Sequence, residues 1–120
     1  MLKGLRTATY FVDDVFKASD WYEKVLGYEP YYKTEHYVGF DVGGYELGIH
    51  PGGKVQNELG GVQAFWGVDD VEAAMKKFVE HGATAFHEPT EVGGGIIIAS
   101  VKDPWGNVFG FIVNPGFKTG

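Results

Sequence analysis

The sequence predicts an α+β fold built from two βαβββ modules, and three observations support this prediction. An alternating apolar run ends in a pair of aspartates twice, at Asp13-Asp14 and at Asp69-Asp70. After each pair, apolar residues recur at helical spacing until a glycine, Gly27 or Gly82. Three short stretches rich in β-branched and aromatic residues then follow in both cases. Each module is therefore predicted to contain a strand, a capped amphipathic helix and three further strands.

The first module is expected to span about residues 5–51. Leu5 to Val12 alternates in polarity, which places Thr7, Thr9 and Phe11 on one face of a strand and predicts that the face ending in Val12 meets the helix. Asp13 or Asp14 is expected to cap a helix that runs to Leu26. Three strands are then predicted at 28–34, 37–42 and 45–50, the last two joined by the hairpin signal Gly43-Gly44.

The second module is expected to span about residues 61–113, after a turn-rich linker at 52–60. A strand is predicted at 61–68, a helix from Asp69 or Asp70 to His81, and strands at 83–92, 96–102 and 108–113. Asp103 to Asn107 carries proline and glycine at positions typical of a reverse turn. Because 120 residues suit one domain, both modules are expected to share one interior across residues 1–120.

Composition excludes several classes of protein. The chain has no cysteine, so disulfide scaffolds, thiolate nucleophiles and sulfur-ligated zinc are excluded. Its formal charge of -6 and the lack of a Lys/Arg cluster argue against nucleic acid as a partner. No apolar run approaches the ~20 residues of a membrane span, and the start lacks a signal-peptide core. A cytoplasmic protein without a membrane partner is therefore expected.

Five short motifs together resemble one family. They are the Val-x-Asp entry to both helices, Trp21-Tyr22, Leu26-Gly27, Gly82-Ala83 and the sequence Asp103-Pro-Trp-Gly-Asn107. In this order and spacing they are similar to the vicinal oxygen chelate superfamily, which comprises glyoxalases, bleomycin-resistance proteins and ring-cleaving dioxygenases. The resemblance covers about residues 5–113. It implies that each module curls into a half-barrel, that two halves form a ligand cleft, and that the protein is a homodimer.

The resemblance also implies where a metal would bind. Metal enzymes of this superfamily hold one divalent ion with four side chains, and those positions fall here on Thr7, Glu46, Gln63 and Gly110. Only Glu46 is a usual ligand, since the others offer a hydroxyl, an amide oxygen and no side chain. No metal and no other cofactor is therefore expected. A shift of the alignment by two residues would instead bring His50 into the site, and this alternative stays open.

Strand parity and the resemblance together give a set of ligand-binding candidates on the concave face. The same parity places Trp66 on the helix side, as core. Trp105, in the reverse turn, is a candidate for ligand stacking or for a contact with a second chain. No Ser-His-Asp order is present, so no catalytic residue is assigned. The ligand-binding candidates are Thr7, Thr9, Phe11, Tyr37, Asp41, Glu46, His50, Gln63, Phe65, Ser100 and Trp105.

Three functional hypotheses follow. The leading one is a non-metal small-molecule-binding protein of the glyoxalase/bleomycin-resistance type, which sequesters an aromatic or cationic compound. The second is a metal-dependent lyase, isomerase or dioxygenase of the same superfamily with a divergent site. The third is an interaction module whose cleft no longer takes a ligand. An open aromatic cleft favours the first, and three ligand-type side chains around one point favour the second.

Overall fold

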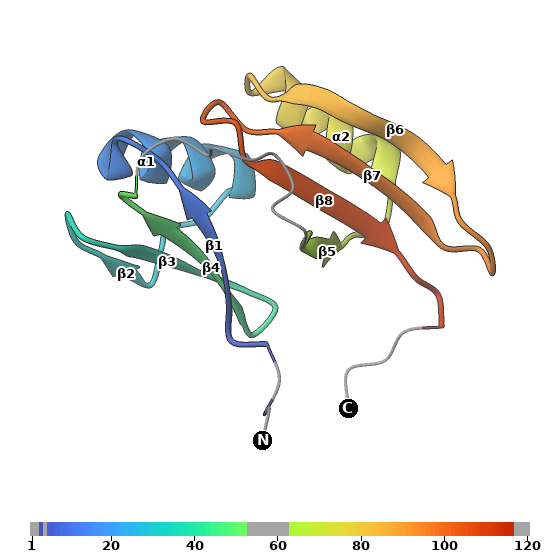
Figure 1. Ribbon diagram of the computed structural model, residues 1–120, viewed down its shortest axis with the longest axis horizontal. Coiled ribbons are helices and arrows are strands. Elements are labelled where there is room, and N and C mark those ends of the chain that lie inside the picture. The colour runs from blue at the N-terminus through green and yellow to red at the C-terminus, as the bar shows by residue number, and fades with distance from the viewer. Residues whose placement is uncertain (1–2, 4, 53–62, 117–120) are drawn as a thin grey trace. The chain divides into compact units, whose positions relative to one another are not determined.

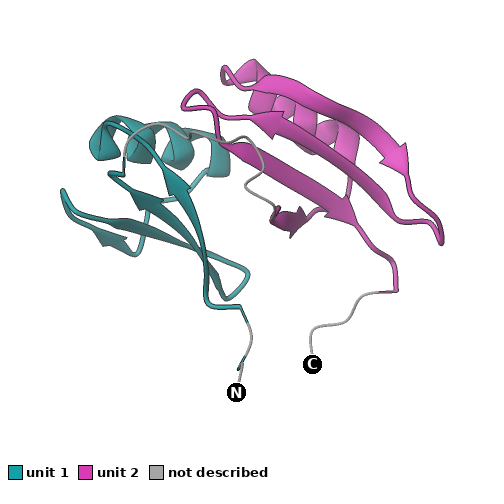
Figure 2. Ribbon diagram, viewed as in Figure 1, with its two compact units in different colours: residues 1–56 teal, residues 57–120 magenta. Residues whose placement is uncertain are grey.

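The computed structural model describes residues 3, 5–52 and 63–116 of the chain. It divides into two compact units, residues 1–56 and residues 57–120 (Figure 2). Each unit contains one helix and one four-stranded sheet (Figure 1). The predicted α+β fold with two βαβββ modules is confirmed.

The first unit contains a mixed sheet with strand order β1-β4-β3-β2. Strand β1 is parallel to β4, and the remaining pairs are antiparallel. Helix α1 follows β1 in the chain and packs against β4 (Figure 1). The elements are β1 (Thr7–Phe11), α1 (Val15–Leu26), β2 (Tyr32–Lys33), β3 (Val38–Val42) and β4 (Tyr45–His50).

The second unit repeats this topology with strand order β5-β8-β7-β6. Strand β5 is parallel to β8, the other pairs are antiparallel, and α2 packs against β6, β7 and β8. The elements are β5 (Phe65–Gly67), α2 (Val71–Glu80), β6 (Thr84–Glu91), β7 (Ile97–Lys102) and β8 (Val108–Val113).

Local side-chain chemistry fixes the ends of both helices. The carboxylates of Asp14 and Asp70 each accept a backbone hydrogen bond of 3.0 Å, from Lys17 and Ala73 respectively. Each bond satisfies an amide that the first helical turn would leave without a partner. Gly27 ends α1 with φ of 90°, a conformation that favours glycine. Both aspartate caps and the glycine stop are confirmed.

In each unit the core lies between the helix and one face of the sheet. Tyr10 and Val12 are buried, which confirms that this face of β1 meets the helix side. The rings of Tyr10 and Tyr22 lie 6.2 Å apart between their centroids. In the second unit Phe78 of α2 contacts Phe109, 4.7 Å away between ring centroids. The opposite face of each sheet is the one that the helix of that unit leaves uncovered.

Two predicted strands are shorter than expected. The stretch 28–34 forms a strand only at Tyr32–Lys33, and Pro30, which has no amide hydrogen, precedes it. The stretch 61–68 forms a strand at Phe65–Gly67, and its first two residues lie outside the described part of the chain. The predicted linker at 52–60 also lies there, except for its first residue. Neither helix among the described residues is long and apolar enough to cross a bilayer.

Candidate functional site

A row of polar side chains crosses the sheet of the first unit on the face opposite α1. The register pairs Glu46 of β4 with Thr7 of β1 and with Asp41 of β3. Directly paired residues project from the same face of a sheet. Leu47, which follows Glu46, is fully buried and thus points the other way, toward the core. The Thr7-Glu46-Asp41 row therefore lies on the face that the core does not use.

Two glycines in the adjacent row let tyrosines lie against the sheet. Gly48 of β4 is paired with Gly39 of β3. A methyl group added to Gly48 would lie 2.7 Å from Cζ of Tyr37, and one added to Gly39 would lie 3.1 Å from Cε1 of Tyr31. A glycine inside a strand commonly marks such a close approach. Both phenol groups consequently reach Glu46 across the space where side chains would otherwise stand.

The hydroxyls of these tyrosines bind the Glu46 carboxylate. Tyr37 donates to Oε1 at 2.6 Å, and Tyr31 donates to Oε2. The Thr7 hydroxyl lies 3.3 Å from the Tyr37 hydroxyl. Both oxygens of Glu46 therefore accept a hydrogen bond from a phenol, and hydrogen bonds to a charged acceptor are the stronger kind.

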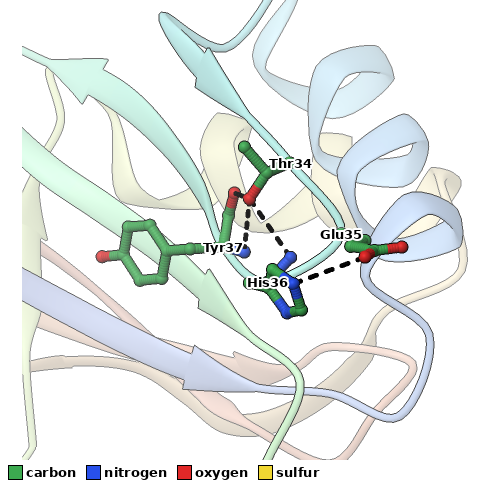
Figure 3. A network of polar contacts seen from close by, with 4 residues as sticks. All are labelled: Thr34, Glu35, His36 and Tyr37. Atoms are coloured by element: carbon green, nitrogen blue, oxygen red, sulfur yellow. Dashed lines mark hydrogen bonds and ion pairs between the residues drawn. The ribbon is translucent and has the colours of Figure 1, made fainter.

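A tight turn before β3 fixes Tyr37. Thr34 Oγ1 accepts hydrogen bonds from the amides of His36 and Tyr37, at 3.1 and 3.2 Å. Figure 3 shows this network, in which the Tyr37 ring points away from the turn while the His36 side chain contacts Glu35. His36 therefore lies in the turn. The turn sets the direction in which the phenol of Tyr37 leaves the backbone.

The network shifts the pKa of each member. Burial acts to raise the pKa of Glu46, but hydrogen bonds from Tyr31, Tyr37 and Thr7 outweigh it and lower that pKa below 4.5. The hydrogen bond to Glu46 raises the pKa of Tyr31 to about 12. Burial, followed by the hydrogen bond to Glu46, raises the pKa of Tyr37. At neutral pH the carboxylate is charged and both phenols are neutral.

A cavity of about 390 Å³ opens beside this network. Two carboxylates and one guanidinium line it, so its formal charge at neutral pH is negative. Tyrosine side chains supply much of the remaining wall. The lining residues are Arg6, Thr7, Tyr31, Asp41, Gly44, Tyr45 and Glu46.

A second cavity, of about 260 Å³, lies within the second unit. It brings together three predicted candidates, Gln63, Phe65 and Ser100. Ser100 is buried, and its hydroxyl lies 3.2 Å from Nδ1 of His87. Each unit thus holds its own cluster of predicted residues.

The remaining candidates lie apart from these cavities. The rings of Phe11 and His50 are in contact, 5.4 Å apart between centroids. Thr9 is the register partner of Gly48, and a hydrogen bond from it acts on Tyr37. Trp105 is half-buried, its amide donates to Asp103 at 2.9 Å, and it lines neither cavity.

The four positions implied for a metal do not form a donor set. Glu46 and Thr7 are register partners, but only the carboxylate of this pair is a usual metal ligand. A methyl group added to Gly110 would lie 3.2 Å from Nε2 of Gln63 and 2.8 Å from Cδ1 of Phe65. Within residues 3, 5–52 and 63–116 there is no group of three or more His, Cys, Asp or Glu side chains arranged to hold a metal. The residues present do not fit a tightly held divalent ion.

Sequence reasoning missed Tyr31, Arg6 and Tyr45 as members of the first cavity. Tyr31 precedes β2, and no alternating pattern in the sequence assigns it to a face. Gly39 and Gly48 did carry a usable signal, because each stands inside a strand where a close approach is expected. Their tyrosine neighbours are the residues that make that approach.

Comparison with known proteins identifies a family for most of the chain. A family model described as the Glyoxalase/Bleomycin resistance protein/Dioxygenase superfamily matches residues 4–111. No curated protein shows significant similarity to the sequence.

Several solved structures share the fold. A glyoxalase-related enzyme from Fulvimarina pelagi superposes with a TM-score of 0.77 and 18% identity, over 99% of this chain and 94% of its own. Lactoylglutathione lyase from Agrobacterium tumefaciens superposes with a TM-score of 0.76 and 19% identity, over 97% of this chain and 98% of its own. A member of the Glyoxalase/bleomycin resistance protein/dioxygenase superfamily from Sphaerobacter thermophilus superposes with a TM-score of 0.72 and 23% identity, over 94% of this chain and 98% of its own. At these identities the likeness shows the fold alone.

Proposed function

Because the chain belongs to the Glyoxalase/Bleomycin resistance protein/Dioxygenase superfamily, we propose that it is a small-molecule-binding protein that works without a metal. Its ligand is an aromatic or cationic compound, which it sequesters without chemical change. The binding site is the cavity beside Glu46 in the first unit. A cavity with tyrosine walls and a net negative charge suits such a ligand.

The hydrogen bonding of Glu46 is the observation that carries this proposal. A general base must exchange a proton near the working pH, which requires a pKa close to it. The lowered pKa of Glu46 and the raised pKa of Tyr31 instead keep both groups in one protonation state at neutral pH. A fixed negative charge held by two neutral phenols supports binding of a cation rather than proton transfer.

The alternative is a metal-dependent lyase, isomerase or dioxygenase. The side chains at the four implied metal positions argue against this alternative. Such chemistry needs an ion that polarises a carbonyl or activates oxygen. Three of the four implied positions carry a hydroxyl, an amide or no side chain. The fold shared with the Agrobacterium lactoylglutathione lyase does not supply the missing ligands.

A calorimetric titration tests the proposal. The cationic glycopeptide bleomycin and neutral aromatic compounds are added to the native chain, to Glu46→Gln and to Trp105→Ala. We expect saturable binding of the cationic compound, with an affinity that falls as salt rises. The Glu46→Gln variant should bind more weakly because the charge is lost.

Two outcomes would contradict the proposal. One is the absence of saturable binding of any compound, which would favour the interaction-module hypothesis. The other is unchanged binding in Glu46→Gln, which would move the site away from this cavity. Trp105→Ala reports separately whether that ring contacts the ligand.

A further inference from the structure

We infer that the cavity beside Glu46 selects organic cations that carry N–H donors, such as primary ammonium ions, over fully methylated cations of equal charge. This inference rests on the proposed function and narrows its ligand class. It follows from where each hydroxyl proton of the network points.

The hydroxyl protons of the network are all used within it. A tyrosine hydroxyl has a single hydrogen, and those of Tyr31 and Tyr37 are donated to the two oxygens of Glu46. The single hydrogen of the Thr7 hydroxyl is donated to the Tyr37 oxygen or to Glu46, because the Tyr37 proton is already used. In either case the Thr7 hydroxyl has no proton left for a ligand.

The atoms of the network and of Asp41 that remain available to a ligand are acceptors. Thr7, Tyr31 and Glu46 line the cavity, and each retains oxygen lone pairs. Asp41 Oδ1 accepts the amide of Gly44 at 2.8 Å, which leaves the second carboxylate oxygen to a ligand. A ligand that brings N–H groups satisfies these acceptors, whereas a quaternary ammonium ion does not.

Charge alone would not make this distinction. Arg6 also lines the cavity, and its Nη1 donates to the backbone oxygen of Lys3 at 3.2 Å. With two carboxylates and one guanidinium, the lining attracts any monovalent cation. The choice among cations of equal charge therefore depends on hydrogen bonding, so it is testable with compounds that share one charge and one phenethyl group.

Isothermal titration calorimetry of the full chain with three probes provides the test. They are phenethylammonium, its N,N,N-trimethyl analogue and neutral 2-phenylethanol. We expect phenethylammonium to bind at least about tenfold more tightly than the trimethyl analogue, because hydrogen bonds to charged acceptors are lost. The neutral alcohol should be the weakest.

The variant Thr7→Val removes one acceptor while preserving side-chain shape. It should weaken the binding of phenethylammonium and leave the affinity for the trimethyl analogue unchanged, so the ratio of the two affinities falls. Thr84→Val, at an exposed position of β6 in the other unit, is the matched control and should leave the ratio as in the native chain.

The possible failures are distinguishable. If the trimethyl analogue binds as tightly as phenethylammonium or more tightly, while Glu46→Gln still weakens binding, the selectivity inference is wrong and the proposed function stands. If neither the probes nor bleomycin bind, both are wrong. An unchanged ratio in Thr7→Val would also overturn the inference.

Discussion

Glu46 is the central residue of the proposed binding site. It stands in the middle of a polar row, and its two oxygens accept from two tyrosines. A carboxylate near other polar groups is often a catalytic base when its pKa is raised. Here the pKa is lowered, so the same side chain becomes a fixed charge.

The first prediction concerns the titration of Glu46. Hydrogen bonds from the phenols stabilise its ionised form, so the folded-state pKa lies below the usual 4.5. This contribution to folding and to cation binding is fully present above pH 4.5 and is lost as the pH falls through the lowered pKa. Tyr31→Phe removes one of these hydrogen bonds and should raise the pKa toward the usual value.

Carbon NMR of the Glu46 carboxyl group measures this pKa directly. Tyr32→Phe, one residue further along and exposed, is the matched control and should leave it unchanged. A native midpoint at or above 4.5, or one that does not move in Tyr31→Phe, would show that the phenol bonds do not govern the charge.

At the scale of single residues, parity along a strand was a good guide. Alternation predicted that Thr7, Asp41 and Glu46 share a face, since the period of a strand is two. It gave no means of placing Tyr31, which belongs to no regular strand pattern. The side chain reaches Glu46 through a turn and a glycine gap, both of which depend on contacts far apart in sequence.

The pair of strand glycines is the feature that builds the site at the scale of elements. Gly48 and Gly39 stand opposite each other, and neither has positive φ. Their lack of a side chain, rather than backbone freedom, is what the structure uses. They leave a groove across β3 and β4 for the tyrosine rings.

The second prediction follows from this arrangement. In Gly48→Ala the new methyl group would lie 2.7 Å from Cζ of Tyr37 and 3.2 Å from the Thr7 hydroxyl. We expect Tyr37 to be displaced, cation binding to weaken, and the free energy of unfolding to fall by about 1–3 kcal/mol, as for overpacking. Urea unfolding and the calorimetric titration measure both effects.

Two controls distinguish overpacking from a loss of stability that any glycine-to-alanine substitution in a strand would cause. Gly67→Ala, in β5, has nothing within 4 Å of the new methyl group and should change stability much less. In a Tyr37→Ala background, Gly48→Ala should also be mild because the obstructing ring is gone. A large loss of stability in that double variant would contradict the explanation.

The element boundaries were predictable where local chemistry defines them. Aspartate caps, the Gly27 stop and the Gly43-Gly44 hairpin, at φ of 61° and 89°, all act within a few residues. The short strands β2 and β5 were overestimated, because a strand's length depends on the partner that it pairs with. Such pairing is set by the whole sheet rather than by local sequence.

At the scale of the whole molecule, the repeat predicted the βαβββ order of elements in both units, and five motifs indicated the family. The order of strands within each sheet, in which the fourth strand of the unit lies beside the first, was not predicted from the sequence. Parity placed Gln63, Phe65 and Ser100 on one face, and these residues line a cavity of the second unit. The joint use of both cavities by one ligand, and the shared interior of the two modules, stay predictions.

The third prediction concerns assembly. Several large apolar side chains of the described residues are exposed, among them Leu5 at 62% and Tyr31 at 62%. Each four-stranded sheet also has two edge strands, β1 and β2 or β5 and β6, that a partner chain can cover. We expect a two-fold symmetric homodimer that buries well over ~1,200 Å² in total. Sedimentation at micromolar concentration should give twice the mass of the chain, and a monomeric mass would contradict the prediction.

The central claim is that the Glu46 carboxylate, held by two tyrosine hydroxyls, binds an organic cation and does not bind a metal. The most direct test dialyses the protein against chelator and titrates it with zinc, nickel, manganese and ferrous ions by calorimetry, with Glu46→Gln in parallel. We predict no stoichiometric uptake, an unchanged thermal midpoint in chelator, and binding of phenethylammonium by the same metal-free sample. Uptake of one ion per chain that is lost in Glu46→Gln would contradict the account.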